Sequence, residues 1–127
     1  MIIVDESLTG ERLHTFTLDS LEERMTTREI IRARIWQEVH EHNAERRSGF
    51  RGFIQPLAEI GRSGAAEPAG FKPVDWEAQY QLALRAFESN GYFILVGDRQ
   101  AESLDETFQV GAETEVSFVK FVPLVGG

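Results

Sequence analysis

The side chains that most often do chemistry are few in this chain, and their spacing argues against a metal or catalytic site. The sequence contains no cysteine, which excludes disulfides, thiolate ligands and a catalytic thiol. His40 and His42 stand two residues apart in a stretch with helical spacing, so they cannot face one another, and His14 is distant in sequence. The neighbouring carboxylates of Glu22 and Glu23 are typical of a solvated surface. We therefore expect no metal ion and no cofactor.

The last two residues, Gly126 and Gly127, are the remaining chemical candidates, because the sequence lacks phosphate-binding and nucleophile motifs. With glycine at about 7% of residues, two in succession occur at a given place roughly 0.5% of the time. A carboxylate behind two glycines can enter a narrow channel, since no side chain blocks the backbone. The alternative is a frayed chain end. Nothing in the chain resembles a self-contained active site, so we expect that it is not an enzyme.

The first elements that would position such a terminus are a hairpin and a helix. Residues 2–4 and 12–18 are rich in β-forming residues, and Gly10 in the turn between them is expected at positive φ. A helix is predicted over 26–43, because Thr26-Thr27-Arg28-Glu29 matches a capping box. Its apolar stripe has helical spacing and consists of Ile30, Ile31, Ile35 and Val39, while Arg28, Arg32, Arg34 and Glu38 fall largely elsewhere.

Residues 45–75 interrupt this pattern and are predicted to form an insertion loop that is basic and partly apolar. Its apolar side chains are expected to pack on the body, to dock on a partner enzyme or to bind a second copy of the chain. A basic loop against an acidic body would give head-to-tail contacts, which extend into filaments unless they close. The predicted self-assembly residues are Phe50, Phe53, Ile54, Arg46 and Arg47.

The rest of the chain predicts a second helix and further strands. The helix begins after Asp75 and ends at Asn90-Gly91, with Gly91 expected at positive φ. Strands follow at 92–96, 99–101 and 115–122, and 123–127 is expected to be a flexible tail. This order predicts one α+β domain over residues 1–127, with helices on one face of a mixed sheet of four to five strands. The last strand should pair in parallel with the first.

This order and several short motifs resemble the β-grasp fold of ubiquitin-like proteins. Ubiquitin has a Leu-Thr-Gly turn where this chain has Leu8-Thr9-Gly10, then a Thr-capped helix like that of Thr26 to Val39. Its Leu-Ile-Phe-Ala-Gly strand and turn are similar to Phe93-Ile94-Leu95-Val96-Gly97, and Gln100-Ala101-Glu102 stands where ubiquitin has Gln-Leu-Glu. Both chains end in Gly-Gly. The resemblance covers about residues 1–44 and 90–127 and is closest to ubiquitin-like proteins of bacterial operons.

The resemblance implies a protein modifier whose terminal Gly-Gly carboxylate is adenylated, passed on as a thioester and conjugated to amines of a target protein. Its expected partners are an activating enzyme, a conjugating enzyme and a JAMM-type isopeptidase, with a role in bacterial antiviral defence. A partner-binding patch like the hydrophobic one of ubiquitin is expected at Ile94, Val119, Phe121 and Leu124. The alternative for the strand residues is that they belong to the core.

The chain departs from ubiquitin in its tail and at one lysine. The tail Pro123-Leu124-Val125-Gly126-Gly127 lacks the arginines of ubiquitin, and Asp98 stands where ubiquitin has a chain-forming lysine. Eukaryotic enzymes and lysine-linked chains are therefore poor expectations. Two other functions stay open: a sulfur carrier that forms a C-terminal thiocarboxylate, and a structural module that assembles through its sheet edges or its insertion.

Charge and hydropathy limit the partners further. There are 13 basic and 21 acidic residues, for a net charge of −8, which disfavours binding to nucleic acid. No apolar run approaches the roughly 20 residues of a membrane span. The first residues lack the basic region and long apolar core of a signal peptide. We expect a cytoplasmic protein that binds no membrane.

Overall fold

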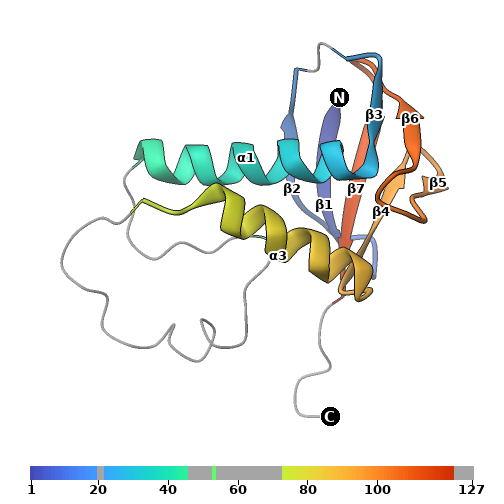
Figure 1. Ribbon diagram of the computed structural model, residues 1–127. Coiled ribbons are helices and arrows are strands. Elements are labelled where there is room, and N and C mark those ends of the chain that lie inside the picture. Colours follow the sequence, from blue (N-terminus) through green and yellow to red (C-terminus); the bar gives the residue numbers. More distant parts are fainter. Residues whose placement is uncertain (20–21, 46–52, 54–72, 122–127) are drawn as a thin grey trace.

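The computed structural model describes residues 1–19, 22–45, 53 and 73–121 of the chain. These residues form a five-stranded sheet, a two-stranded sheet and two helices. Both helices lie side by side on the same face of the larger sheet (Figure 1). The prediction of an α+β protein with helices on one face of a mixed sheet is confirmed.

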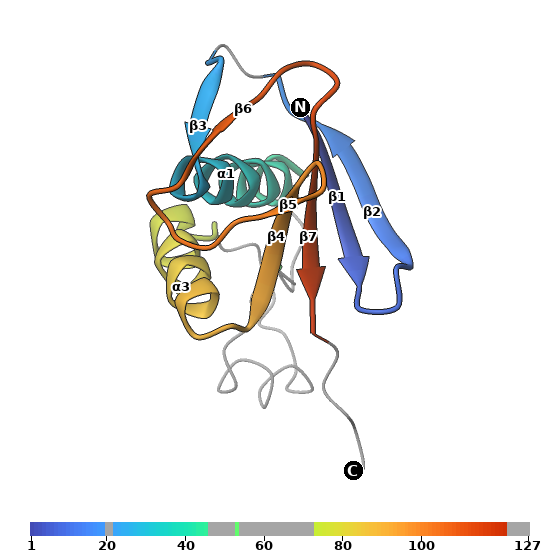
Figure 2. The same cartoon turned by 90° about the vertical axis from the view of Figure 1, so that its right-hand side faces the viewer.

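The five-stranded sheet brings the first and last strands together at its centre, in the order β2-β1-β7-β4-β5. β1 (Ile2–Ser7) runs antiparallel to β2 (Arg12–Thr17) and parallel to β7 (Glu115–Lys120), as Figure 2 shows. β4 (Tyr92–Val96) pairs antiparallel with β7, and the short β5 (Arg99–Gln100) forms the far edge. The predicted parallel pairing of the first and last strands is confirmed.

Helix α1 (Thr27–Glu45) begins at the predicted capping box. The Thr26 amide donates to Glu29 Oε1 at 2.9 Å, and the Glu29 amide donates to Thr26 Oγ1 at 3.1 Å. Helix α3 (Trp76–Glu88) is capped by Asp75, whose carboxylate accepts the Glu77 amide at 3.0 Å. Both predicted helix starts are therefore correct to within a residue or two.

The glycines at two turns play different parts. Gly10 adopts the expected positive φ, at 87°. At the end of α3 the positive φ of 62° belongs to Asn90 and not to Gly91, because asparagine also tolerates this conformation. Gly91 instead allows its backbone to lie close to that of Ala86. A Cβ at position 91 would lie 3.2 Å from the Ala86 carbonyl oxygen, to which the Gly91 amide donates at 2.7 Å.

A small second sheet supports the start of α1. Its strands are β3 (Arg24–Thr26) and β6 (Thr107–Gln109), which pair antiparallel. The loop before β6 accepts the first helical amides, because Thr27 donates to Glu106 O at 2.9 Å and Arg28 to Leu104 O at 3.0 Å. The sequence analysis did not predict these strands, since three residues are too few to show a periodicity.

The core fills the space between the two helices and the inner face of the larger sheet. Its fully buried side chains include those of Ile3, Ile30, Ile31, Ile35, Val39, Tyr92, Ile94, Val116 and Phe118. The predicted apolar stripe of α1 is thus confirmed as its buried face. Among the residues that the structure describes, no helix is long and apolar enough to cross a membrane.

Candidate functional site

The central strand β7 is the last described element before the predicted reactive terminus in the sequence. This strand ends at Lys120, the register partner of Ser7 in β1. Gly126, Gly127 and Leu124 lie outside the described residues. The parallel pairing runs from Ile2↔Glu115 to Ser7↔Lys120, so β7 ends at the opposite end of the sheet from Met1. Five residues at about 3.3 Å each separate these two ends by roughly 17 Å.

The expected partner-binding patch is only partly at the surface. Ile94 is 0% exposed and belongs to the core, so its assignment to a surface patch was wrong. The cause is strand alternation: Tyr92, Ile94 and Val96 point toward the helices, and the residues between them point away. Val119 is on the outer face opposite Phe93 but is only 4% exposed. Phe121, at 39%, is exposed.

The outer face of β4 and β7 carries a different apolar group, which we call the outer sheet patch: Phe93, Leu95, Val119 and Phe121. The rings of Phe93 and Phe121 lie 5.7 Å apart, with Val119 directly opposite Phe93 in the sheet. Phe93 and Leu95 are half-buried. Leu8 is exposed in the turn after Ser7, at the same end of the sheet as Phe121. This arrangement offers a partner aromatic and aliphatic surface next to the end of β7.

A buried charge cluster lies on the inner face at this end of the sheet. It consists of Asp5 on β1, Arg34 and Glu38 on α1, and Lys120 on β7. Arg34, 4% exposed, donates Nε and Nη2 to the two Asp5 carboxylate oxygens at 3.2 and 2.5 Å, and Nη1 to Glu38 Oε2 at 2.9 Å. Burial raises the pKa of Glu38 above its ordinary value of 4.5 against the opposing effect of Arg34. Burial also lowers the pKa of Lys120.

Phe53 closes this cluster from the insertion. Its ring lies 4.7 Å from the Arg34 guanidinium carbon and 5.2 Å from Lys120 Nζ, and it meets Tyr92 and Phe118 edge to face. Phe53 is 7% exposed, so its assignment to a self-assembly surface was wrong: the side chain is part of the body's core. The other residues of that predicted surface, Arg46, Arg47, Phe50 and Ile54, lie outside the described residues.

Sequence reasoning missed the charge cluster, although one signal was present. Arg34 follows Ile30 and Ile31 at helical spacing, so it falls on the buried face of α1. The prediction that Arg34 lies off this face was wrong. Asp5 stands two residues after Ile3 in β1 and so shares its inward face. A charged residue on each of two apolar faces indicates a buried pair, because neither charge is stable there alone.

His14 and His40 each lie against an aromatic ring, and His14 is the register partner of Asp5 in the sheet. The His40 ring stacks on Trp36 at 4.5 Å, while His14 lies beside Phe16 at 5.3 Å on β2. Within the described part of the chain, no group of three or more histidine and carboxylate side chains is arranged to hold a metal ion.

Comparisons with protein-family models, with curated proteins and with solved structures found no match. What the chain does therefore has to follow from its own residues and geometry.

Proposed function

We propose that the chain is a ubiquitin-like protein modifier with a β-grasp fold. The observation that carries the proposal is the sheet order β2-β1-β7-β4-β5, with the parallel first and last strands at the centre and α1 packed across them. This arrangement agrees with the β-grasp order that the sequence motifs resemble. It is independent of the Leu8-Thr9-Gly10 turn and of the terminal glycines on which the resemblance was first based.

The position of β7 suits a protein that presents its C-terminal segment. β7 pairs with β1 from Glu115 to Lys120 and with β4 from Val116 to Lys120, and Lys120 packs against Phe53 in the charge cluster. The strand is thus fixed up to the residue where the tail sequence begins. A rigid strand end gives an enzyme a defined surface to bind beside the tail. Less conformational freedom is therefore lost on binding.

The proposed chemistry occurs at the Gly127 carboxylate on partner enzymes. A carboxylate oxygen attacks the α-phosphorus of ATP, the bond to pyrophosphate breaks, and an acyl adenylate forms. A cysteine thiolate of the activating enzyme then attacks the acyl carbon and displaces AMP, which gives a thioester. An amine of the target finally attacks the thioester carbon and releases the thiolate, which leaves an isopeptide bond. Gly126 keeps the approach to the acyl carbon free of side chains.

The outer sheet patch supports a role in binding these partners. It is apolar, partly exposed and close to the end of β7, so an enzyme that held Phe93 and Phe121 could also reach the tail. The conjugating enzyme, the JAMM-type isopeptidase and the setting in bacterial antiviral defence come from the resemblance alone and are proposed with it.

The test is to incubate the protein with ATP and an activating enzyme encoded in its own genome, and to measure intact masses. We expect a thioester on the enzyme that is released by a thiol reductant. The matched control is the chain without Gly126 and Gly127, which should remain folded but form no adduct. A thiocarboxylate formed with a sulfur donor, without any isopeptide product, would favour the sulfur carrier instead. An adduct on the truncated chain would contradict both functions.

A further inference from the structure

A groove at the opposite end of the sheet from Lys120 has no role in the modifier chemistry. It is lined by residues at the end of β2, by Leu18, Asp19 and Glu22, and by the first half of α1, and its volume is about 770 Å³. This size falls within the range of roughly 300–1,000 Å³ that is usual for ligand sites. Met1, which lines the groove, precedes the start of β1, so the groove and Lys120 are at opposite ends of the parallel strand pair.

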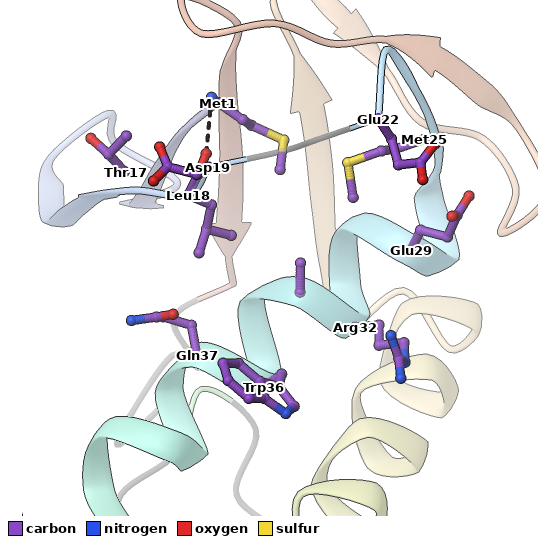
Figure 3. A pocket seen from close by; sticks show the side chains of 11 residues that line it. Met1, Thr17, Leu18, Asp19, Glu22, Met25, Glu29, Arg32, Trp36 and Gln37 are labelled. Atoms are coloured by element: carbon purple, nitrogen blue, oxygen red, sulfur yellow. Dashed lines mark hydrogen bonds between the residues drawn. The ribbon is translucent and has the colours of Figure 1, made fainter. Parts of the chain in front are cut away.

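The floor of the groove is apolar. Figure 3 shows the side chains of Met1 and Met25 pointing toward each other from its two sides, with Leu18 pointing down toward α1. Met1 and Met25 are 2% and 8% exposed and belong to the core, so the apolar surface that a ligand could contact is that of Leu18, Ala33 and Trp36. Trp36 lies along α1 at the edge of the groove and is 43% exposed, with its ring stacked on His40. A large exposed aromatic beside an apolar hollow is typical of a binding surface.

The rim of the groove is acidic. The exposed carboxylates of Asp19, Glu22 and Glu29 surround it, against the Arg32 guanidinium and the α-ammonium of Met1, which donates to Leu18 O at 3.1 Å. The Arg32 charge faces the Trp76 ring at 5.1 Å, away from the rim carboxylates. Glu29 also accepts the Thr26 amide at its Oε1 atom. The rim thus favours cationic groups around an apolar centre.

We propose that this groove binds a basic peptide segment of a partner protein, with a leucine-like side chain against Leu18, Ala33 and Trp36 and lysine or arginine side chains at the rim. The net charge of −8 would also attract such a segment from a distance. A partner held there leaves the end of β7 accessible, because the two regions lie at opposite ends of the sheet. This docking does not depend on activation of Gly127.

The experiment is an NMR titration of the ¹⁵N-labelled protein with the synthetic peptide Lys-Leu-Arg-Lys-Leu-Lys. We expect saturable shifts at the Ala33 amide and the Trp36 indole, with the Trp76 indole much less affected. The peptide Glu-Leu-Glu-Glu-Leu-Glu should not bind, and Lys-Ser-Arg-Lys-Ser-Lys should bind at least about tenfold more weakly. Added salt should weaken binding, because rim charges are exposed.

Two variants locate the site on the protein. Asp19→Lys and Trp36→Ala should each weaken peptide binding by about tenfold or more, and both alter exposed side chains. The matched controls, Glu88→Lys and Leu13→Ala, change equally exposed residues outside the groove and should bind as the wild type does.

Three outcomes would overturn the proposal. The first is the lack of a saturable shift in the wild type, and the second is equal binding of the acidic peptide or of the Asp19→Lys variant. The third is that the groove residues show the same shifts when the concentration of the protein is raised without peptide. A second copy of the chain would then be the molecule that binds in the groove.

Discussion

The Arg34 side chain of α1 forms a bidentate ion pair with Asp5 of β1, and both residues are buried. Arg34 Nη2 lies 2.5 Å from Asp5 Oδ2. The same guanidinium lies against the rings of Phe16, Phe53 and Phe118. One residue of the main helix thus connects a central strand, the insertion and the end of the sheet from which the tail leaves.

Removal of one partner of this pair should be strongly destabilising. Asp5→Ala leaves the Arg34 charge buried and, among the residues that the structure describes, paired with Glu38 alone, so we expect a loss of about 3–5 kcal/mol in the free energy of unfolding. The matched control is Glu115→Ala, which breaks the exposed pair with Arg12 at 2.6 Å and should cost about 1 kcal/mol or less. Urea denaturation of both variants measures these losses in the free energy of unfolding. Equal losses would mean that the buried pair stabilises the fold no more than the exposed pair does.

Phe53 should act as the anchor of the insertion and not as a contact between copies. Phe53→Ala removes a buried ring from the cluster of Arg34, Tyr92 and Phe118, so we expect a loss of about 3–5 kcal/mol of stability. Phe121→Ala, at an exposed position, should cost about 1 kcal/mol or less. A Phe53 variant that kept its stability but changed its mass in light scattering would restore the self-assembly role.

Glu38 should give stability an unusual dependence on pH. Burial raises its pKa in the folded state above the ordinary value of 4.5, so the folded state binds its proton more tightly than the unfolded state does. Its contribution is therefore fully present below pH 4.5 and is lost as the pH rises through the folded pKa. The stability of the wild type relative to Glu38→Gln should fall from pH 4 upward; a relative rise over this range would show that the Arg34 charge outweighs burial.

The outer sheet patch should matter for transfer and little for folding. The double variant Phe93→Ser, Phe121→Ser should slow thioester formation about tenfold or more, because its aromatic contact with a partner enzyme is lost. Leu13→Ser, which changes an exposed leucine outside the patch, is the control and should react at the wild-type rate. Circular dichroism checks that both remain folded. An unchanged rate for the double variant would place the enzyme contact elsewhere on the chain.

The larger elements could be predicted because local chemistry and periodicity agreed with the fold. The capping box at Thr26 and Glu29, the stripe of isoleucines on α1 and the Asp75 cap all form as expected. The parallel pairing of β1 and β7 follows from strands at both ends with helices between them. These signals are local, so a single sequence carries them.

The inward or outward direction of individual residues was harder to predict. Ile94 sits in an unbroken apolar run, where nothing in the sequence tells which alternate residues face the helices. Arg34 was assigned to the outside because charged residues are usually exposed, whereas Asp5, far away in sequence, stabilises it inside. Phe53 could be recognised as apolar, but only the tertiary contacts decide between core and surface.

Exchange of radiolabelled pyrophosphate into ATP by the activating enzyme tests the modifier proposal most directly, because it reports reversible formation of the acyl adenylate alone. We predict that the wild-type chain stimulates exchange in a saturable way and that the chain without Gly126 and Gly127 does not. The Phe93→Ser, Phe121→Ser variant should need a higher concentration for the same rate. Exchange that is equal with and without Gly126 and Gly127, or absent with the wild type, would contradict the assignment of the Gly127 carboxylate as the reactive group.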